Sequence, residues 1–204
     1  MTIPRLLVGW KILIDQTTKH YDPLLPAGPG GLRDYPGALV GSDLPSTVPR
    51  SYKWLPYHAG EITTTELDND VLTGPMSGCP IAVYYIGGST KVAHIGTSDV
   101  DAQSRDVKER WRAFAIDRRN QVLLGFNPFR ALDNVPIPAS QAGENPVPEY
   151  WGLITVDKGL FGLIVYGPTF PPAPPTQVPY RIALVEEVPS VGDAAVRNWG
   201  FLGL

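Results

Sequence analysis

The stretch Ile81-Ala-Val-Tyr-Tyr-Ile86, followed by Gly87-Gly-Ser89 and then by Lys91-Val-Ala-His-Ile-Gly-Thr97, predicts a β-hairpin. Both outer runs are rich in β-branched and aromatic residues, and the glycines between them allow a tight turn. The only cysteine, Cys79, lies just before the first run, and His94 lies on the second. Because the two arms of a hairpin lie side by side, we expect these two side chains to be close together. Cysteine and histidine are the minimum set for catalysis by a thiolate nucleophile.

The composition limits the classes of protein that need to be considered. The chain has 204 residues, 43% of them hydrophobic, which suits one domain over residues 1–204. A net charge of -3 gives no basic excess for binding phosphates, so nucleic acid is not an expected partner. One cysteine excludes an intrachain disulfide. No apolar run is long enough for a membrane span, and no signal peptide is recognisable, so export would need a signal-independent route or release from a longer precursor.

Outside the hairpin, the patterns predict a chain made mostly of strands. Runs of β-branched and aromatic residues between turn residues are typical of strands. Such runs occupy residues 5–14, 51–57, 61–67, 121–126 and 180–185, and a second hairpin is predicted from 150–156 and 160–166. The total indicates a β-rich α+β fold.

One helix is predicted, from Ala102 to about Asp117, with Ser98 as its N-cap. Its apolar residues recur at helical spacing and should form one buried face: Val107, Trp111, Phe114 and Ala115. Three proline-rich stretches are predicted to be loops: 22–50, with one short strand at 38–40, then 127–148 and 168–179. A short helix is also considered for the tail from Gly192 to Leu204.

Residues around the cysteine add to the catalytic interpretation. Gly78 permits a tight turn in which successive N–H groups point at one spot, where they could bind an oxyanion. Thr73 precedes Cys79 by six residues and offers a hydroxyl or a carbonyl that could orient the imidazole of His94. The three histidines lack metal-ligand spacing, so no metal site is expected. The alternative is that Cys79 is a small buried hydrophobic residue with no chemical role.

The same residues resemble a family of toxins that deamidate glutamine. Met76-Ser-Gly-Cys79 is similar to the Leu-Ser-Gly-Cys motif of the cytotoxic necrotizing factor catalytic domain and the Burkholderia lethal factor. His94 follows Cys79 by 15 residues, as in the necrotizing factors, whereas the step from Thr73 to Cys79 matches the lethal factor and the chemotaxis receptor deamidases. Trp54-Leu-Pro-Tyr57, followed by Gly60-Glu61, resembles a Trp-Leu-Pro-Trp stretch with a following Gly-Glu in the lethal factor. The similarity covers residues 52–97.

The resemblance implies a fold and a mechanism. The fold would be a sandwich of two packed mixed sheets flanked by a few helices. The activity would be that of a hydrolase acting on a side-chain amide, a protein-glutamine deamidase that needs no metal or organic cofactor. Cys79 would be the nucleophile, with a thiol pKa lowered beside an imidazolium, His94 the base and Thr73 the group that orients it. Ser77 and Gly78 would shape the oxyanion site, so Ser77 is not expected to be a nucleophile.

The resemblance also implies a partner and a location. The substrate would be a host protein with a reactive glutamine: first the DEAD-box helicase of translation initiation, second a Rho-family GTPase and third a chemoreceptor-type protein. The chain would be a monomeric bacterial toxin or effector, a virulence factor secreted without a recognisable signal peptide, that acts in the host cytoplasm and binds neither nucleic acid nor membrane. The alternatives are a non-catalytic β-rich binding module, or a cysteine protease or transglutaminase that uses the same thiol.

Overall fold

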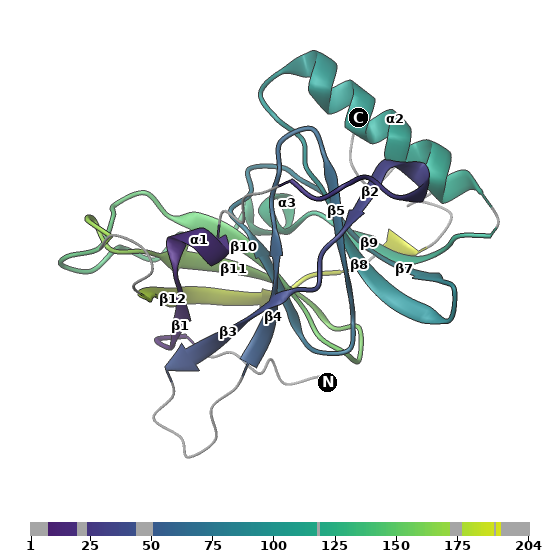
Figure 1. Cartoon of the computed structure of the whole chain (residues 1–204). Coiled ribbons are helices and arrows are strands. Elements are labelled where there is room, and N and C mark those ends of the chain that lie inside the picture. The colour runs from purple at the N-terminus through teal and green to yellow at the C-terminus, as the bar shows by residue number, and fades with distance from the viewer. Residues whose placement is uncertain are drawn as a thin grey trace.

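A closed barrel, an open sheet and one long helix form the three parts of the structure (Figure 1). The computed structural model describes residues 8–19, 24–43, 51–117, 119–171, 177–189 and 191–192. Far more of these residues belong to strands than to helices, so the predicted α+β class with a predominance of β-structure is confirmed.

Seven strands close the barrel in the order β1-β12-β11-β10-β6-β4-β3. The pairs are antiparallel except for β4 and β6, which run parallel. The strands are β1 (Lys11–Ile14), β3 (Ala38–Asp43), β4 (Ser51–Pro56), β6 (Val71–Gly74), β10 (Glu149–Ile154), β11 (Leu160–Tyr166) and β12 (Val178–Glu187). Large side chains pack together in its core, where the rings of Trp54 and Trp151 meet edge to face with centroids 4.9 Å apart.

Six strands form the open sheet in the order β13-β9-β7-β8-β5-β2. The pairs are again antiparallel, with one parallel pair, β2 and β5. The strands are β2 (Leu32–Asp34), β5 (Ile62–Glu66), β7 (Ile81–Ile86), β8 (Ser89–Ile95), β9 (Gln121–Phe126) and β13 (Val191–Gly192). Short helical segments lie between strands of the two sheets. They are α1 (Gln16–Lys19) and the 3-10 turn η1 (Pro29–Gly31), between β1 and β2, and α3 (Pro128–Leu132), between β9 and β10.

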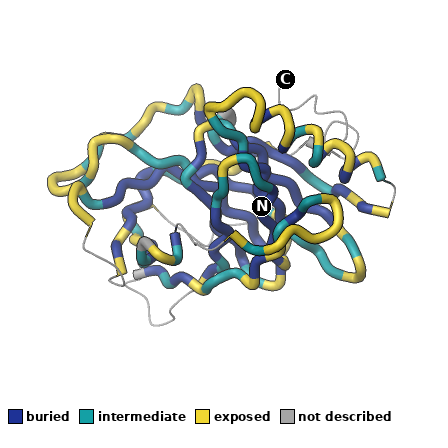
Figure 2. The backbone as a smooth tube through the Cα atoms, turned by 45° about the horizontal axis from the view of Figure 1, so that its top comes forward, coloured by how far each residue is buried: buried dark blue, intermediate teal, exposed yellow. Residues whose placement is uncertain are grey.

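Both faces of the open sheet are buried, which explains why β7 is apolar along most of its length. Successive residues of a strand point to opposite faces. Ile81 and Val83 therefore join a cluster with barrel residues such as Leu55, whereas Ala82 and Tyr84 join the cluster beneath α2 (Asp101–Ile116). Figure 2 shows the buried residues concentrated in the strands, with exposed residues along the connections and the outer side of the helix.

Several predicted elements are confirmed. Both hairpins are present, as β7 with β8 and as β10 with β11. The predicted apolar face of α2 is buried. The short strand expected at 38–40 is the first half of β3. Residues 5–7 of the first predicted strand, residues 172–176 of the third loop and the tail helix beyond Gly192 lie outside the described residues.

Other predictions are wrong in detail. The two sheets are both mixed, as expected, but the closure of one of them into a seven-stranded barrel was not predicted. Ser98 does not cap α2. The N-cap is Val100, without a side-chain hydrogen bond. The Ser98 hydroxyl instead accepts from the Val100 N–H and donates to Gln103 Oε1, while the Ser98 backbone bonds to the Ser104 hydroxyl. Strands β2 and β6 and helix α3 were not predicted from the sequence, since three to five residues are too few for a periodic pattern.

No helix in the described ranges has the length and apolar character needed to cross a membrane.

Candidate active site

The three predicted site residues meet where the barrel and the open sheet pack together. Thr73 lies on β6 of the barrel, His94 on β8 of the open sheet, and Cys79 on the segment that joins β6 to β7. Ile81 is the cross-strand partner of His94, and Cys79 precedes Ile81 by two residues. The pairing continues beyond the strand, because the Ile95 N–H donates to the Pro80 carbonyl. Cys79 therefore lies on the same, barrel-facing side of the sheet as His94.

A short hydrogen bond fixes the imidazole of His94. The Thr73 hydroxyl lies 2.6 Å from His94 Nδ1 and donates to the Leu55 carbonyl at 2.8 Å. A hydroxyl has one proton, and a carbonyl oxygen only accepts, so the hydroxyl accepts from Nδ1–H. The neutral ring is therefore protonated at Nδ1 and carries its lone pair on Nε2. The predicted contact between Thr73 and His94 is confirmed, and its catalytic role stays a prediction.

The imidazole is held in its neutral, basic form. His94 is 1% exposed, and burial lowers its pKa from 6.5 to about 3, with a further contribution from the neighbouring His58. Nε2 is buried and has no hydrogen-bond partner among the residues that the structure describes. An unpaired polar atom in a buried position is costly, and a catalytic role is one explanation for retaining it. Nε2 can accept a proton from a group that approaches it.

Cys79 is a protonated thiol in this state. Its side chain is 3% exposed, and burial raises the thiol pKa, although hydrogen bonds from Thr97 and from the Ser77 N–H and the charge of Lys108 offset part of the effect. The expected lowering of the thiol pKa by an imidazolium is therefore wrong here, because a buried, neutral His94 supplies no positive charge. The sulfur instead lies 3.3 Å from Thr97 Oγ1 and 3.6 Å from the Thr97 carbonyl oxygen.

The turn before the cysteine has free backbone donors. Gly78 has a φ of 148°, which side-chain-bearing residues rarely adopt, and its carbonyl accepts from Asn127 Nδ2 at 2.9 Å. The Met76 N–H donates to the Tyr150 carbonyl, which anchors the other end of the turn to β10. Within the described residues, the N–H groups of Gly78 and Cys79 have no acceptor. They are available to an incoming oxyanion.

A cavity of about 360 Å³ opens beside Cys79. This volume suits an amino-acid side chain with its neighbours. Aromatic rings form much of its wall: those of Phe129 and Tyr150 meet edge to face at 4.7 Å, and Tyr57 lies near Cys79. Met76, Ser77 and Glu149 also line it. Ser77 is exposed at this edge, and its predicted part in shaping an oxyanion site stays a prediction.

Five further residues contribute to the site and were not singled out from the sequence: Tyr57, Thr97, Asn127, Phe129 and Tyr150. Tyr57 and Thr97 belong to the two stretches that resemble the toxin family, so those motifs could have pointed to them. The other three come from the proline-rich loop at 127–148 and its edges, where no pattern in the sequence links them to Cys79.

No group of three or more His, Cys, Asp or Glu side chains suitable for a metal ion occurs in the part of the chain that the structure covers.

Comparisons of the chain with protein-family models, with curated proteins and with solved structures found no match. The function is therefore inferred from the residues of the site.

Proposed function

We propose that the chain is a protein-glutamine deamidase in which Cys79 is the nucleophile, His94 the general base and Thr73 the residue that orients the base. The observation that carries this proposal is the hydrogen bond from His94 Nδ1 to the Thr73 hydroxyl, which leaves the lone pair on Nε2 unpaired on the face where Cys79 lies. A nucleophile, a base and an orienting group are the recurring components of nucleophilic catalysis. Here His94 and Thr73 are in contact, whereas the hydrogen bonds of the Cys79 sulfur go to Thr97.

The first half of the reaction forms a thioester. A glutamine side chain enters the cavity, and the Cys79 sulfur attacks its amide carbon while the thiol proton moves to His94 Nε2. The oxygen of the tetrahedral intermediate accepts from the N–H groups of Gly78 and Cys79. His94 then returns the proton to the amide nitrogen, which leaves as ammonia.

The second half releases glutamate. Water enters where ammonia left, His94 takes one of its protons, and the oxygen attacks the thioester carbon. The carbon–sulfur bond breaks, and the proton on His94 passes to the sulfur. The enzyme returns to the neutral thiol and neutral imidazole of the resting site. The residues that carry these steps are all in the chain, so the proposal includes no metal or organic cofactor.

The substrate and its setting are part of the proposal. The target is a host protein: the translation-initiation DEAD-box helicase first, then a Rho-family GTPase. The chain then acts as a bacterial effector in the host cytoplasm. The family's sandwich fold also belongs here: its support is the apolar cluster shared by the barrel and the open sheet, in which barrel residue Leu55 joins Cys79 and Ile81.

Mass spectrometry of a host-cell lysate tests this function. The lysate is incubated with the wild-type chain or with Cys79→Ser, and peptides are searched for glutamine converted to glutamate. We expect one converted glutamine, with ammonia released and no new peptide ends, only in the wild-type sample. Peptide cleavage would indicate a protease, and incorporation of an added amine a transglutaminase. Equal conversion by Cys79→Ser would exclude Cys79 as the nucleophile.

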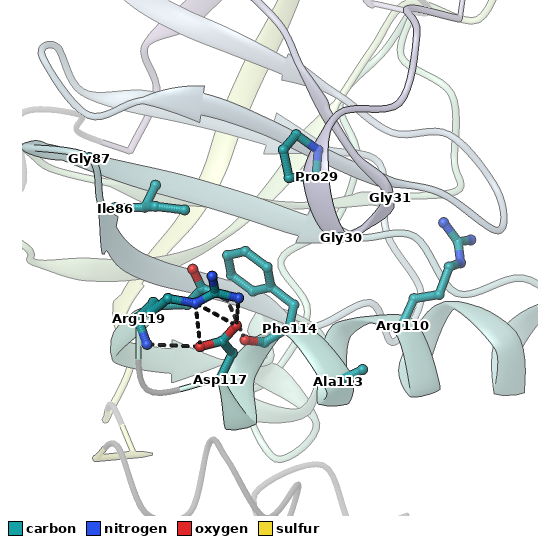
Figure 3. Close-up of a pocket in the computed structure, with 11 residues that line it drawn as sticks. Pro29, Gly30, Gly31, Ile86, Gly87, Arg110, Ala113, Phe114, Asp117 and Arg119 are labelled. Carbon is teal, nitrogen blue, oxygen red and sulfur yellow. Dashed lines mark hydrogen bonds and ion pairs between the residues drawn. The ribbon is translucent and has the colours of Figure 1, made fainter.

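A non-catalytic binding module is the second candidate, and one observation favours it. A larger cavity, about 680 Å³, lies on the opposite side of the open sheet from Cys79, between α2, η1 and the β7–β8 turn (Figure 3). Phe114 and Ile86 face it, and an ion pair between Asp117 and Arg119 lies at one end. The two candidates differ in the behaviour of Cys79. If iodoacetamide fails to label the folded chain while no glutamine changes in the lysate, the binding module is favoured.

A further inference from the structure

Thr97 lies beside the Cys79 sulfur, two residues after the end of β8, the strand that carries His94. Two of its oxygens approach the Cys79 sulfur, Oγ1 at 3.3 Å and the carbonyl oxygen at 3.6 Å. The carbonyl can only accept, so it can bond to the neutral thiol but repels a thiolate. The hydroxyl can do both: it accepts from S–H in the resting state and donates to S⁻ after the proton has left. A hydrogen bond to a charged acceptor is about twice as strong as a neutral one.

Tyr57 links Thr97 to the base. Its hydroxyl donates to the Thr97 carbonyl at 2.7 Å, and its ring lies 5.4 Å from the ring of His94. Burial raises the pKa of Tyr57 to about 12, so the phenol keeps its proton and remains a donor. By occupying a lone pair of the carbonyl, Tyr57 reduces the negative potential beside the sulfur and holds the Thr97 backbone in place.

The charged and titratable groups around the Cys79 sulfur provide little stabilisation of a thiolate. His94 on β8 is buried and neutral, and His58 lowers its pKa further. Lys108 on α2 favours the thiolate, but it is the smallest of the effects on the thiol pKa, after burial, Thr97 and the Ser77 N–H. Asp99 acts on Tyr57, and Glu149 lines the cavity while paired with Lys19. No strong positive charge among the described residues faces the sulfur, so hydrogen-bond donors must stabilise the thiolate.

We infer that Thr97 is a further catalytic residue, whose hydroxyl donates to the Cys79 thiolate as it forms, and that Tyr57 is the residue that positions it. The catalytic role of Thr97 rests on the proposed function, whereas its hydrogen bond to the Cys79 thiolate does not. In the step itself, the S–H bond breaks, its proton passes to His94 Nε2, and the Thr97 Oγ1–H turns toward the sulfur. The Thr97 hydroxyl keeps its proton throughout, and the sulfur electron pair forms the bond to the amide carbon.

Alkylation of Cys79 by iodoacetamide at a series of pH values tests the inference without a protein substrate. Thr97→Val removes the hydroxyl and keeps the shape of the side chain, whereas Thr97→Ser keeps the hydroxyl. We expect the apparent thiol pKa of Thr97→Val to rise by about one unit, so that alkylation below the pKa slows about tenfold, because the thiolate fraction falls by that factor. Thr97→Ser should alkylate at a rate close to that of the wild type.

Tyr57→Phe removes only the phenol hydroxyl and keeps the ring against His94. It should raise the thiol pKa by less than Thr97→Val does, since the Thr97 hydroxyl remains. Circular dichroism spectra and thermal melts of all three variants check that each is folded before its rate is compared. An unchanged profile in folded Thr97→Val, or an equal rise in Thr97→Ser, would overturn the role of the hydroxyl.

The alkylation result and the lysate result are separable. A raised thiol pKa in Thr97→Val supports the interaction with the thiolate even if no glutamine in the lysate is converted, an outcome that would count against deamidation alone. An unchanged thiol pKa, together with normal deamidation by Thr97→Val, would overturn the inference and leave the proposed function standing.

Discussion

The hydroxyl of Thr73 and Nδ1 of His94 lie 2.6 Å apart and join the two sheets of the molecule. Thr73 belongs to the barrel, where its hydroxyl also donates to the Leu55 carbonyl on the neighbouring strand, and His94 belongs to the open sheet. The orientation and tautomer of the base are thus set by the packing of one sheet on the other. Cys79, on the connection between the sheets, depends on the same packing.

The first prediction concerns this hydrogen bond. Thr73→Val keeps the size of the side chain but leaves the Nδ1–H and the Leu55 carbonyl without their partner. A net hydrogen bond contributes about 0.5–1.5 kcal/mol, which corresponds to a fall in kcat of up to about tenfold if the tautomer is no longer held. Thr73→Ser keeps the hydroxyl and should retain most of the activity. The rates of ammonia release by the two variants, compared at an equal fraction of folded protein, test this prediction. Equal rates would show that the hydroxyl does not orient the base.

The second prediction concerns the protonation state of the resting site. Because burial raises the thiol pKa and keeps His94 neutral, the thiolate is a minor species at neutral pH. The rate of alkylation of the wild-type chain should therefore rise about tenfold per pH unit between about pH 6 and 8, without a plateau. In a thiolate–imidazolium pair the thiol would already be ionised below about pH 7, so the rate of alkylation would be nearly constant between about pH 6 and 8. The rate at each pH is measured by quenching samples of the alkylation reaction and analysing them by mass spectrometry. A rate that stays constant at low pH would contradict a neutral Cys79 thiol beside a neutral His94.

The sequence predicted the centre of the fold well because local chemistry decides it. The β7–β8 hairpin follows from Gly87 and Gly88 between two β-branched runs, and α2 follows from apolar residues at helical spacing. The contact of His94 with Thr73 was anticipated from the logic of a base and its orienting group, and the structure contains it.

Tertiary pairing decided the features that the sequence did not predict. Closure of the barrel depends on β1 pairing with β3 and β12, strands distant from one another in the chain, and no local pattern encodes that choice. Strand β6 has four residues and gains its partners only from β4 and β10. The raised thiol pKa is likewise a property of burial, which the residues Ser-Gly-Cys alone do not reveal.

The third prediction concerns stability and pH. In the unfolded chain His94 binds a proton below about pH 6.5, whereas in the folded chain its pKa is about 3. Between these values the unfolded state binds more protons, so the free energy of unfolding falls as the pH falls. At pH 5 the loss relative to pH 7 should be about 2 kcal/mol from this residue. Urea unfolding of the wild type and of His94→Gln at both pH values isolates the effect. The variant should lose less stability on acidification, and an identical loss in both chains would contradict the buried neutral imidazole.

The fourth prediction separates substrate binding from chemistry at the cavity wall. Phe129 contacts Tyr150 edge to face and lines the cavity, but it makes no described contact with Cys79 or His94. Phe129→Ala removes apolar surface from the cavity wall, so KM for a protein substrate should rise up to about tenfold, a loss of about 1.4 kcal/mol of binding, while kcat changes little. Loss of the aromatic pair with Tyr150 should lower stability by about 0.5–1.5 kcal/mol. Phe129→Leu, which keeps an apolar side chain there, should have a smaller effect. Because alkylation by a small reagent does not need this wall, its pH profile should be the same in both variants as in the wild type. A fall in kcat with unchanged KM would instead place Phe129 in the catalytic machinery.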